Sequence, residues 1–267
     1  MARLAGGTLI LLLLNTLAEF LPISSTAHST LVGRFFSPEI DLRLLLATSQ
    51  LAIDLVLCFY FRKFLWRIAR DFFFDRAVRS LCRSLILTSM PFLLAGALFG
   101  GPVRKYFYSS GAIALCLVLG GVFLLFVEGQ LARGKVVPQN LDSLEGIEPG
   151  DMYRIGLAQM VSLVPGVSRL ASTLGAALLL GLPRAVAVDF SFLISTPVGL
   201  AGALFDILGG VGKMGVGDFR LLLGYFIANV LFALFFVKGM LGFLKRCRLD
   251  IFGYYRIALG LVIALFF

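Results

Sequence analysis

Charged side chains are scarce in this chain of 267 residues. Only 15% of the residues are charged, whereas 59% are hydrophobic and Phe alone occurs 26 times. Soluble globular proteins contain about 25% charged residues, and a fold of this length could not bury so much apolar side chain in water. The composition therefore excludes a soluble enzyme, a disordered protein and a small secreted domain held by disulfides. It predicts an integral membrane protein.

Cysteine and histidine are also scarce. The four cysteines are far apart in the sequence, and His28 is the single histidine. Without a Cys-x-x-Cys motif or a Cys/His cluster, neither a zinc site nor a disulfide framework is predicted. Lys and Arg outnumber Asp and Glu by 24 to 15, but nothing resembles an aromatic and basic groove for nucleic acid. We interpret the excess as the positive-inside charge of a membrane protein, together with attraction to anionic headgroups.

Long apolar segments indicate where the chain crosses the membrane. Each is close to the ~20 residues that a helix needs to cross ~30 Å of hydrocarbon. Continuous apolar runs favour helices over a β-barrel, whose strands alternate between apolar and polar residues. The sequence therefore predicts an all-α polytopic protein with six transmembrane helices, at about 42–61, 84–101, 111–128, 185–209, 219–237 and 251–267.

Two further apolar regions, 4–36 and 152–181, are interrupted by prolines and polar residues. A continuous helix facing lipid would not carry these groups in mid-membrane. Broken backbone is tolerated where protein covers it or where it lines a polar cavity. We therefore expect two re-entrant helix pairs whose tips lie inside the protein.

The basic residues of the loops predict how the chain is oriented. Loop 62–83 contains seven Lys and Arg residues and loop 238–250 contains four, whereas the loops near 102–110 and 210–218 contain two and one. Cytoplasmic loops are enriched in Lys and Arg. We therefore expect the first two loops in the cytoplasm, the other two outside, and both chain termini outside.

A short internal repeat links the two interrupted regions. Residues 21–30 (LPISSTAHST) align with residues 164–173 (VPGVSRLAST), 143 positions later, with four identities. In each half the broken segment precedes three spans, and three is odd, so the second half is inverted relative to the first. We predict a single integral membrane domain, 1–267, built from inverted repeats 1–135 and 136–267. Its binding site is expected near the midplane, where the broken helices meet.

The first interrupted region concentrates polar groups that are costly in a membrane. Asn15 and Glu19 are four residues apart and so lie on one helix face. A carboxylate in a membrane should face a wet cavity, a cation or a basic partner; a glutamate at the membrane surface is the alternative. The consecutive hydroxyls of Ser24, Ser25 and Thr26 follow a proline. This pattern is typical of a helix N-terminus whose free N–H groups can hold an anion.

The second interrupted region contains Gly166, Ser168, Arg169, Ser172 and Thr173. The glycine lets the backbone approach a ligand closely. The three hydroxyls lie on one side of a new helix start, and the guanidinium offers a planar fork suited to phosphate oxygens. A guanidinium at the midplane requires an anionic ligand or a carboxylate partner.

Together the two tips predict a phosphate or diphosphate site that opens sideways toward lipid. His28 lies within two turns of Glu19 and beside the hydroxyls, so a role in proton transfer competes with the more usual structural role of a lone histidine. The alternative for the whole cluster is an Arg169–Glu19 ion pair that only braces the two repeats.

Both tips also resemble the signatures of one family. Residues 19–28 (EFLPISSTAH) resemble the EFLPxSSTGH signature of the bacitracin-resistance (BacA/UppP) family of undecaprenyl-diphosphate phosphatases. Residues 164–173 resemble the PGxSRSxxT signature of the same family. Further matches occur at 156–159, 189–197 and 255–260, and the resemblance runs from about residue 6 to the C-terminus.

The resemblance implies a multi-pass hydrolase of the bacterial plasma (inner) membrane, with its active site open to the periplasmic side. It implies hydrolysis of undecaprenyl diphosphate to undecaprenyl phosphate and phosphate, which recycles the lipid carrier of cell-wall (peptidoglycan) synthesis and confers bacitracin resistance. The alternative is a catalytically weakened relative that binds or translocates polyprenyl phosphate. The implied cofactor is a divalent cation, Mg²⁺ or Ca²⁺. The implied partners are the polyprenyl diphosphate and membrane lipids; a homo-oligomer is left open.

Residue roles are carried over by position. Glu19 is the expected essential carboxylate, acting on a metal or a proton, and Asn15 joins it as a cation ligand. Ser25 is a nucleophile or phosphate ligand, His28 an acid or base, and Arg169 the clamp on the diphosphate. The expected phosphate-binding residues are Ser24, Thr26, Gly166, Ser168, Arg169, Ser172 and Thr173.

The chain departs from the family pattern at positions that bear on the site. Asn15 replaces the family's first carboxylate, so the side chain brings no negative charge and cannot act as a base. Asp54, one turn beyond Gln50, is an unusual intramembrane carboxylate. We hypothesise that it partly replaces the missing charge. Further departures are Ala27, Ala52, Leu170 and Ala171.

Overall fold

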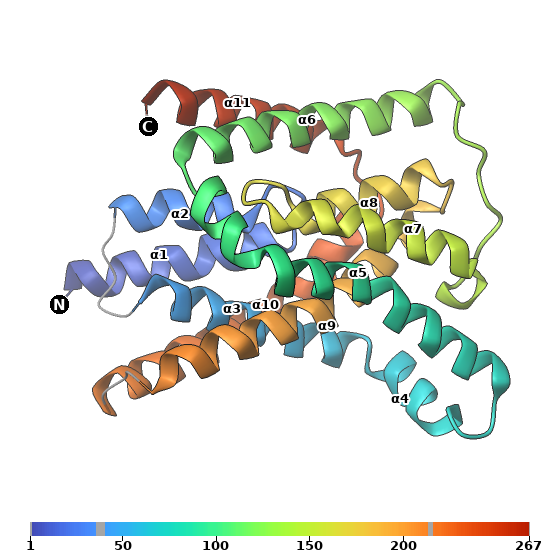
Figure 1. Ribbon diagram of the computed structural model, residues 1–267, viewed down its shortest axis with the longest axis horizontal. Helices are drawn as coiled ribbons and strands as arrows, with labels where there is room; N and C mark the ends of the chain where they lie inside the picture. Colours follow the sequence, from blue (N-terminus) through green and yellow to red (C-terminus); the bar gives the residue numbers. More distant parts are fainter. Residues whose placement is uncertain (1, 36–40, 213–215, 267) are drawn as a thin grey trace.

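A computed structural model describes residues 2–35, 41–212 and 216–266, and within these ranges it contains helices and no strand (Figure 1). The helices are α1 (Ala2–Glu19), α2 (Ser25–Phe35), α3 (Leu42–Tyr60), α4 (Arg62–Asp71), α5 (Arg76–Phe107), α6 (Ser110–Ala132), α7 (Pro149–Met160), α8 (Arg169–Leu179), α9 (Arg184–Val211), α10 (Val216–Leu244) and α11 (Asp250–Phe266), with short 3-10 segments η1 (Leu144–Gly146) and η2 (Val161–Leu163).

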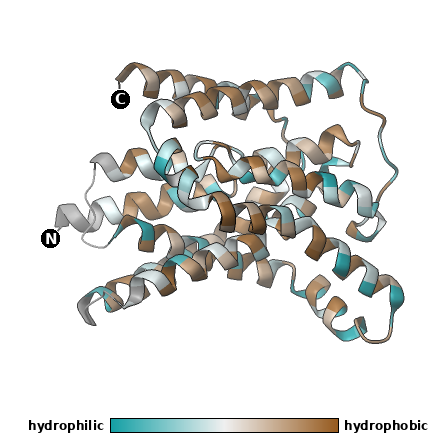
Figure 2. Ribbon diagram, in the orientation of Figure 1, coloured by the Kyte–Doolittle hydropathy of each residue, from teal (hydrophilic) through white to brown (hydrophobic). Residues whose placement is uncertain are grey.

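Five helices of the described ranges are long and apolar enough to cross a membrane: α3, α5, α6, α9 and α10. They coincide with the first five predicted spans, so the prediction of an all-helical, multi-pass membrane protein is confirmed. The sixth predicted span corresponds to α11, a helix of 17 residues that is not among these five, so a sixth crossing stays a prediction. Figure 2 shows hydrophobic residues along these helices and hydrophilic ones around α4 and the start of α5.

Large apolar side chains cover the outside of the molecule. Phe205 is 71% exposed, Leu208 77% and Phe235 79%. A soluble protein would not present so many such residues to water. The exposed apolar surface is typical of helices that face lipid.

Both interrupted regions fold as two helices joined by a turn. We call residues 20–24, between α1 and α2, the first turn, and residues 164–168, which precede α8, the second turn. Gly166 has φ of +94°, which a glycine adopts without steric cost. Ser24 has φ of +73°, uncommon for a residue with a Cβ. Each turn therefore bends sharply just before a new helix begins.

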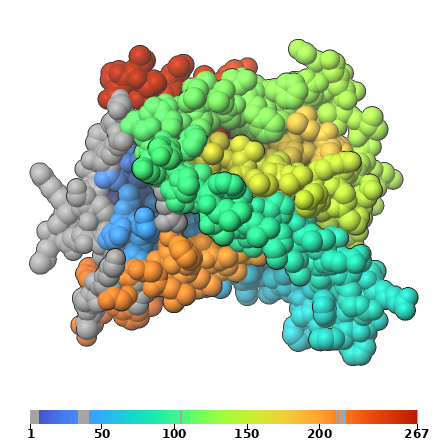
Figure 3. All heavy atoms as spheres, viewed as in Figure 1, coloured from blue at the N-terminus to red at the C-terminus, as the bar shows by residue number. Residues whose placement is uncertain are grey.

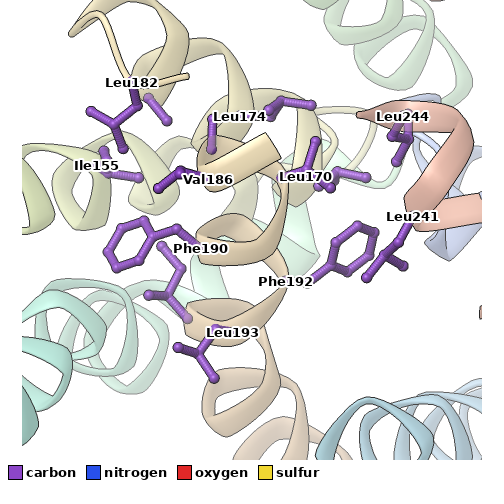
Figure 4. Packing of buried hydrophobic residues seen from close by; sticks show 14 of the residues in the cluster. Ile155, Leu170, Leu174, Leu182, Val186, Phe190, Phe192, Leu193, Leu241 and Leu244 are labelled. Atoms are coloured by element: carbon purple, nitrogen blue, oxygen red, sulfur yellow. The ribbon is translucent and has the colours of Figure 1, made fainter. Parts of the chain in front are cut away.

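The interior is built around α8 and the first half of α9. Ile155, Val186 and Phe190 pack on one side of α9, and Phe192 faces Leu241 on another (Figure 4). These side chains are buried, three of them completely, at 0% exposure. Leu170 and Leu174 of α8 belong to the same buried cluster, so this packing positions the start of α8.

Glycines bring α6 and α11 into close contact along one edge of the molecule (Figure 1). A Cβ added to Gly121 would lie 2.6 Å from the carbonyl oxygen of Gly253, so only glycine fits at this crossing. In the space-filling view, α5, α6 and α7 cover the upper and central part of the near face of the molecule (Figure 3). In each of the two turns three of the five residues are buried and none is exposed.

Candidate active site

A polar cavity of about 200 Å³ lies where the first and second turns meet. It is formed by the end of α1, the start of α2, parts of α3 and α5, the segment between α7 and α8, and the start of α8. Six residues predicted from the sequence line it: Glu19, Ser24, Ser25, Thr26, Ser168 and Arg169. The other lining residues are Ala18, Gln50, Phe92, Ser162, Val167 and Leu170.

Glu19 connects the two halves of the cavity. Its Oε1 accepts a hydrogen bond of 2.5 Å from the Ser25 hydroxyl. Its Oε2 lies 3.6 Å from Nη2 of Arg169, which comes from the other half of the chain. The Glu19 and Arg169 side chains are each 19% exposed. The carboxylate is therefore placed to take a proton from Ser25 while it balances the charge of the guanidinium.

Two helices begin at this cavity. α2 begins at Ser25, and the Ser24 hydroxyl accepts from the backbone N–H of Ala27. α8 begins at Arg169, and the Ser168 hydroxyl accepts from the backbone N–H of Ala171. The first turn of each helix has N–H groups without helical partners and carries partial positive charge. The cavity is therefore suited to an anion.

A chain of hydrogen bonds runs from Arg169 into α3. Nη2 of Arg169 donates to Oε1 of Gln50 over 3.0 Å, and Nε2 of Gln50 donates to Oδ2 of Asp54 over 3.0 Å. Asp54 is buried. A Cβ on Gly199 of α9 would collide with the Asp54 carboxylate and the Gln50 amide. The absence of a side chain at Gly199 thus makes room for this pair.

Asn15 is buried and lies outside the lining of the cavity, as far as the described residues define it. Its Oδ1 accepts a hydrogen bond of 2.7 Å from the Ser29 hydroxyl, which ties α1 to α2. The next residue, Thr16, donates to Oδ1 of Asn229 on α10 over 2.9 Å. Asn15 therefore supplies an amide that joins helices.

His28 is held between the first turn and α11. Its Nδ1 lies 2.8 Å from the Ser24 carbonyl oxygen, and its Nε2 lies 2.6 Å from the Tyr255 hydroxyl. A carbonyl only accepts, so Nδ1 carries a proton; when the ring is neutral, Nε2 accepts from the Tyr255 hydroxyl. Among the described residues, those that line the cavity do not include His28.

Three predicted phosphate ligands, Gly166, Ser172 and Thr173, have structural roles in the second turn and in α8. The Ser172 hydroxyl donates to the Ser168 carbonyl over 3.0 Å, and the Thr173 hydroxyl donates to the Arg169 carbonyl over 3.1 Å. Gly166 provides the sharp bend of the second turn. Within the described part of the chain, these three residues also lie outside the cavity lining.

Arg256 links both turns from α11, and the sequence analysis did not single it out. It is fully buried. Its Nη1 donates to the Pro22 carbonyl over 3.1 Å, and its Nη2 donates to the Gly166 carbonyl over 2.9 Å and the Cys116 carbonyl over 3.3 Å. A basic residue within the apolar segment 251–267 was the signal that could have identified it.

The cavity offers oxygen donors for a divalent cation. Across the described ranges, no group of three His, Cys, Asp or Glu side chains is placed to hold a metal. Glu19 and Ser25 supply a carboxylate and a hydroxyl. Mg²⁺ is commonly held by one or two carboxylates together with substrate phosphates. The residues therefore fit a cation that binds with a phosphorylated ligand.

Comparison with known proteins gives a consistent assignment. The family model for bacitracin resistance protein BacA matches residues 8–262. An undecaprenyl-diphosphatase of Neisseria meningitidis is 32% identical over 251 residues, which are 94% of this chain and 91% of that protein. Proteins of the same name from Laribacter hongkongensis and Bordetella pertussis are each 31% identical, over 92% and 93% of this chain and 89% and 91% of their own lengths. The chain therefore belongs to the bacitracin resistance protein BacA family.

Proposed function

We propose that this protein is an undecaprenyl-diphosphate phosphatase of the bacterial membrane. It hydrolyses undecaprenyl diphosphate to undecaprenyl phosphate and phosphate, the activity that the names of its relatives describe. One observation carries the proposal for the site: Glu19, Ser25 and Arg169 meet in a polar cavity at the start of two helices. This set provides a base, a nucleophile and an anion clamp.

In the proposed reaction, Arg169 and the free N–H groups of α2 and α8 bind the diphosphate. Glu19 takes the proton of the Ser25 hydroxyl, and the Ser25 oxygen attacks the terminal phosphorus. The bond from that phosphorus to the bridging oxygen breaks, and undecaprenyl phosphate leaves. Water then hydrolyses the phosphoserine to release phosphate. Catalysis rests mainly on charge stabilisation and positioning, as in other phosphoryl transfers.

A divalent cation, Mg²⁺ or Ca²⁺, is part of this proposal. Glu19 would hold it together with oxygens of the diphosphate, and it would neutralise phosphate charge. Asp54 would add negative charge behind Arg169 through Gln50 and keep the Gln50 amide oxygen turned toward the guanidinium. His28, bonded to Ser24 and Tyr255, would position the first turn.

We also propose that the two halves are inverted repeats with re-entrant hairpins. In Figure 1, α1 and α2 enter and leave at the end where the termini lie, whereas α7 and α8 enter from the end that carries α4. Helices in equivalent places of the two halves pack together, α3 with α9 and α6 with α11. The basic loop that contains α4 would be cytoplasmic, so the first hairpin would enter from the periplasmic side.

Phosphate release from undecaprenyl diphosphate by the purified protein tests the function. We expect release in the presence of Mg²⁺ or Ca²⁺ and its loss in Arg169→Ala. Lys245→Ala, which removes the ion pair with Asp189, is the control for loss of a partly buried ion pair. No release with any divalent cation, together with retained binding of polyprenyl phosphate, would instead support the weakened relative that binds or translocates its lipid.

A further inference from the structure

A second cavity, of about 210 Å³, lies between α3, α5 and α9 beside the start of α4. Its surface is apolar. The two hydroxyls that reach it are already bonded within their helices, Ser89 to the Leu85 carbonyl and Thr196 to the Phe192 carbonyl. The remaining lining residues are Leu57, Cys58, Phe61, Leu65, Leu85, Leu193, Ile194, Pro197 and Leu200.

The apolar cavity follows the polar cavity along two helices. On α3, Gln50 lines the polar cavity and Leu57, seven residues later, lines the apolar one, a separation of about 10 Å along the helix. On α5, Phe92 lines the polar cavity and Ser89 the apolar one. Residues three apart share a helix face, so the two cavities are neighbours.

We propose that the apolar cavity binds the part of the substrate's isoprenoid chain next to the diphosphate, an inference that rests on the proposed function. The hydrocarbon of a polyprenyl diphosphate begins at the diphosphate oxygen, so a headgroup in the polar cavity requires an apolar surface within a few bonds. Leu57, Leu193 and Leu200 provide this surface, and the satisfied hydroxyls of Ser89 and Thr196 do not oppose it.

The apolar cavity is expected to orient the isoprenoid chain through its shape and to contribute little binding free energy. The chain enters from lipid, which is as apolar as the cavity, so its transfer gains little hydrophobic free energy. Contact with the walls instead fixes the direction of the first isoprenoid units and thereby the position of the phosphate beside Ser25. The cavity is therefore expected to affect turnover of long substrates more than that of short ones.

Filling the cavity tests the proposal. Cys58→Trp places a large ring in it, and Cys82→Trp is the matched control, because Cys82 is also half-buried and is not among the described residues that line the cavity. We expect the ratio of kcat/KM for farnesyl diphosphate to that for dimethylallyl diphosphate to fall about ten-fold in Cys58→Trp and to stay constant in Cys82→Trp. An unchanged ratio in Cys58→Trp would overturn the proposal.

Protection of Cys58 provides a second test that needs no hydrolysis. In a variant whose other three cysteines are replaced by alanine, Cys58 is alkylated by a small maleimide with and without ligand. Farnesyl methylenediphosphonate, which is not hydrolysed, should slow alkylation several-fold, and methylenediphosphonate alone should not. Equal rates with both ligands would contradict the tail site. Absence of phosphate release by the unmodified protein would contradict the function, so the two failures are distinguishable.

Discussion

The first and second turns have related sequences, but the charged side chains beside them have opposite sign. Each precedes a helix whose capping serine accepts from the backbone, Ser24 in one and Ser168 in the other. The first turn is flanked by the carboxylate of Glu19 and by Ser25, the proposed nucleophile; the second leads into the guanidinium of Arg169. The two turns therefore provide two similar helix starts, and the side chains that differ between them are those we propose as the base, the nucleophile and the clamp.

Removal of the two serines that the repeat aligns, Ser25 and Ser168, separates these contributions most strongly. Ser25→Ala should lower kcat about a thousand-fold or more, because no other group replaces an attacking hydroxyl. Ser168→Ala removes a helix cap worth about 1 kcal/mol and should mainly lower the thermal unfolding temperature. Phosphate release and thermal unfolding measure the two effects. Equal losses of kcat in both variants would mean that the turns are not specialised.

Arg256 tests whether both turns must be held together. Arg256→Met leaves buried carbonyls of both turns without donors, at about 1–3 kcal/mol each, and should lower kcat about a hundred-fold. Arg256→Lys retains a donor and should recover part of this loss. Initial rates of phosphate release measured over a range of substrate concentrations separate the effect on KM from the effect on kcat. Full activity in Arg256→Met would show that the turns hold their positions without this contact.

Asp54 tests whether the clamp of the second turn depends on α3. Asp54→Leu should lower kcat/KM about ten-fold, because Gln50 loses its orientation. Asp54→Asn keeps an acceptor for Gln50, so it should lower kcat/KM less than Asp54→Leu does. Because it removes the proposed negative charge, it should raise the cation concentration that gives half-maximal phosphate release. Asp151→Asn is the control, since Asp151 accepts from Gln139 in the same way at 2.8 Å. Unchanged kcat/KM and cation dependence in both Asp54 variants would refute the proposed role.

The smallest expected effect concerns His28, which lies in α2 and is hydrogen-bonded to the first turn and to α11. Tyr255→Phe removes its partner and should lower kcat about three-fold, as expected for the loss of one hydrogen bond. His28→Gln can still donate and accept, and should leave the shape of the pH–rate profile unchanged. Loss of one limb of that profile in His28→Gln would assign His28 as the acid or base.

Local sequence pattern was sufficient for much of the fold. Apolar runs of membrane length placed α3, α5, α6, α9 and α10. Interrupted apolar segments located both turns, because prolines and clustered hydroxyls cannot continue a helix that faces lipid. The cost of a carboxylate and a guanidinium in a membrane also predicted that Glu19 and Arg169 share a site, and they lie 3.6 Å apart.

Contacts between distant segments were not predictable in this way. Arg256 bonds to carbonyls that any residue type could supply, and Gln50 reaches Arg169 across 119 positions. By contrast, the contacts of Ser172 and Thr173 were within reach, because short hydroxyl side chains in a helix often bond to the carbonyl four residues earlier. Ser172 and Thr173 were predicted as phosphate ligands only because they lie in the motif at 164–173, whereas their hydroxyls bond to backbone carbonyls.

A double-mutant cycle tests the central claim, that one residue from each half acts on one diphosphate. kcat/KM for undecaprenyl diphosphate is measured in Glu19→Gln, Arg169→Ala and the double variant. If the two side chains act on the same group, the double variant should be about as impaired as the worse single variant. If the fold-losses of the single variants multiply in the double variant, the two residues act independently and the account is contradicted.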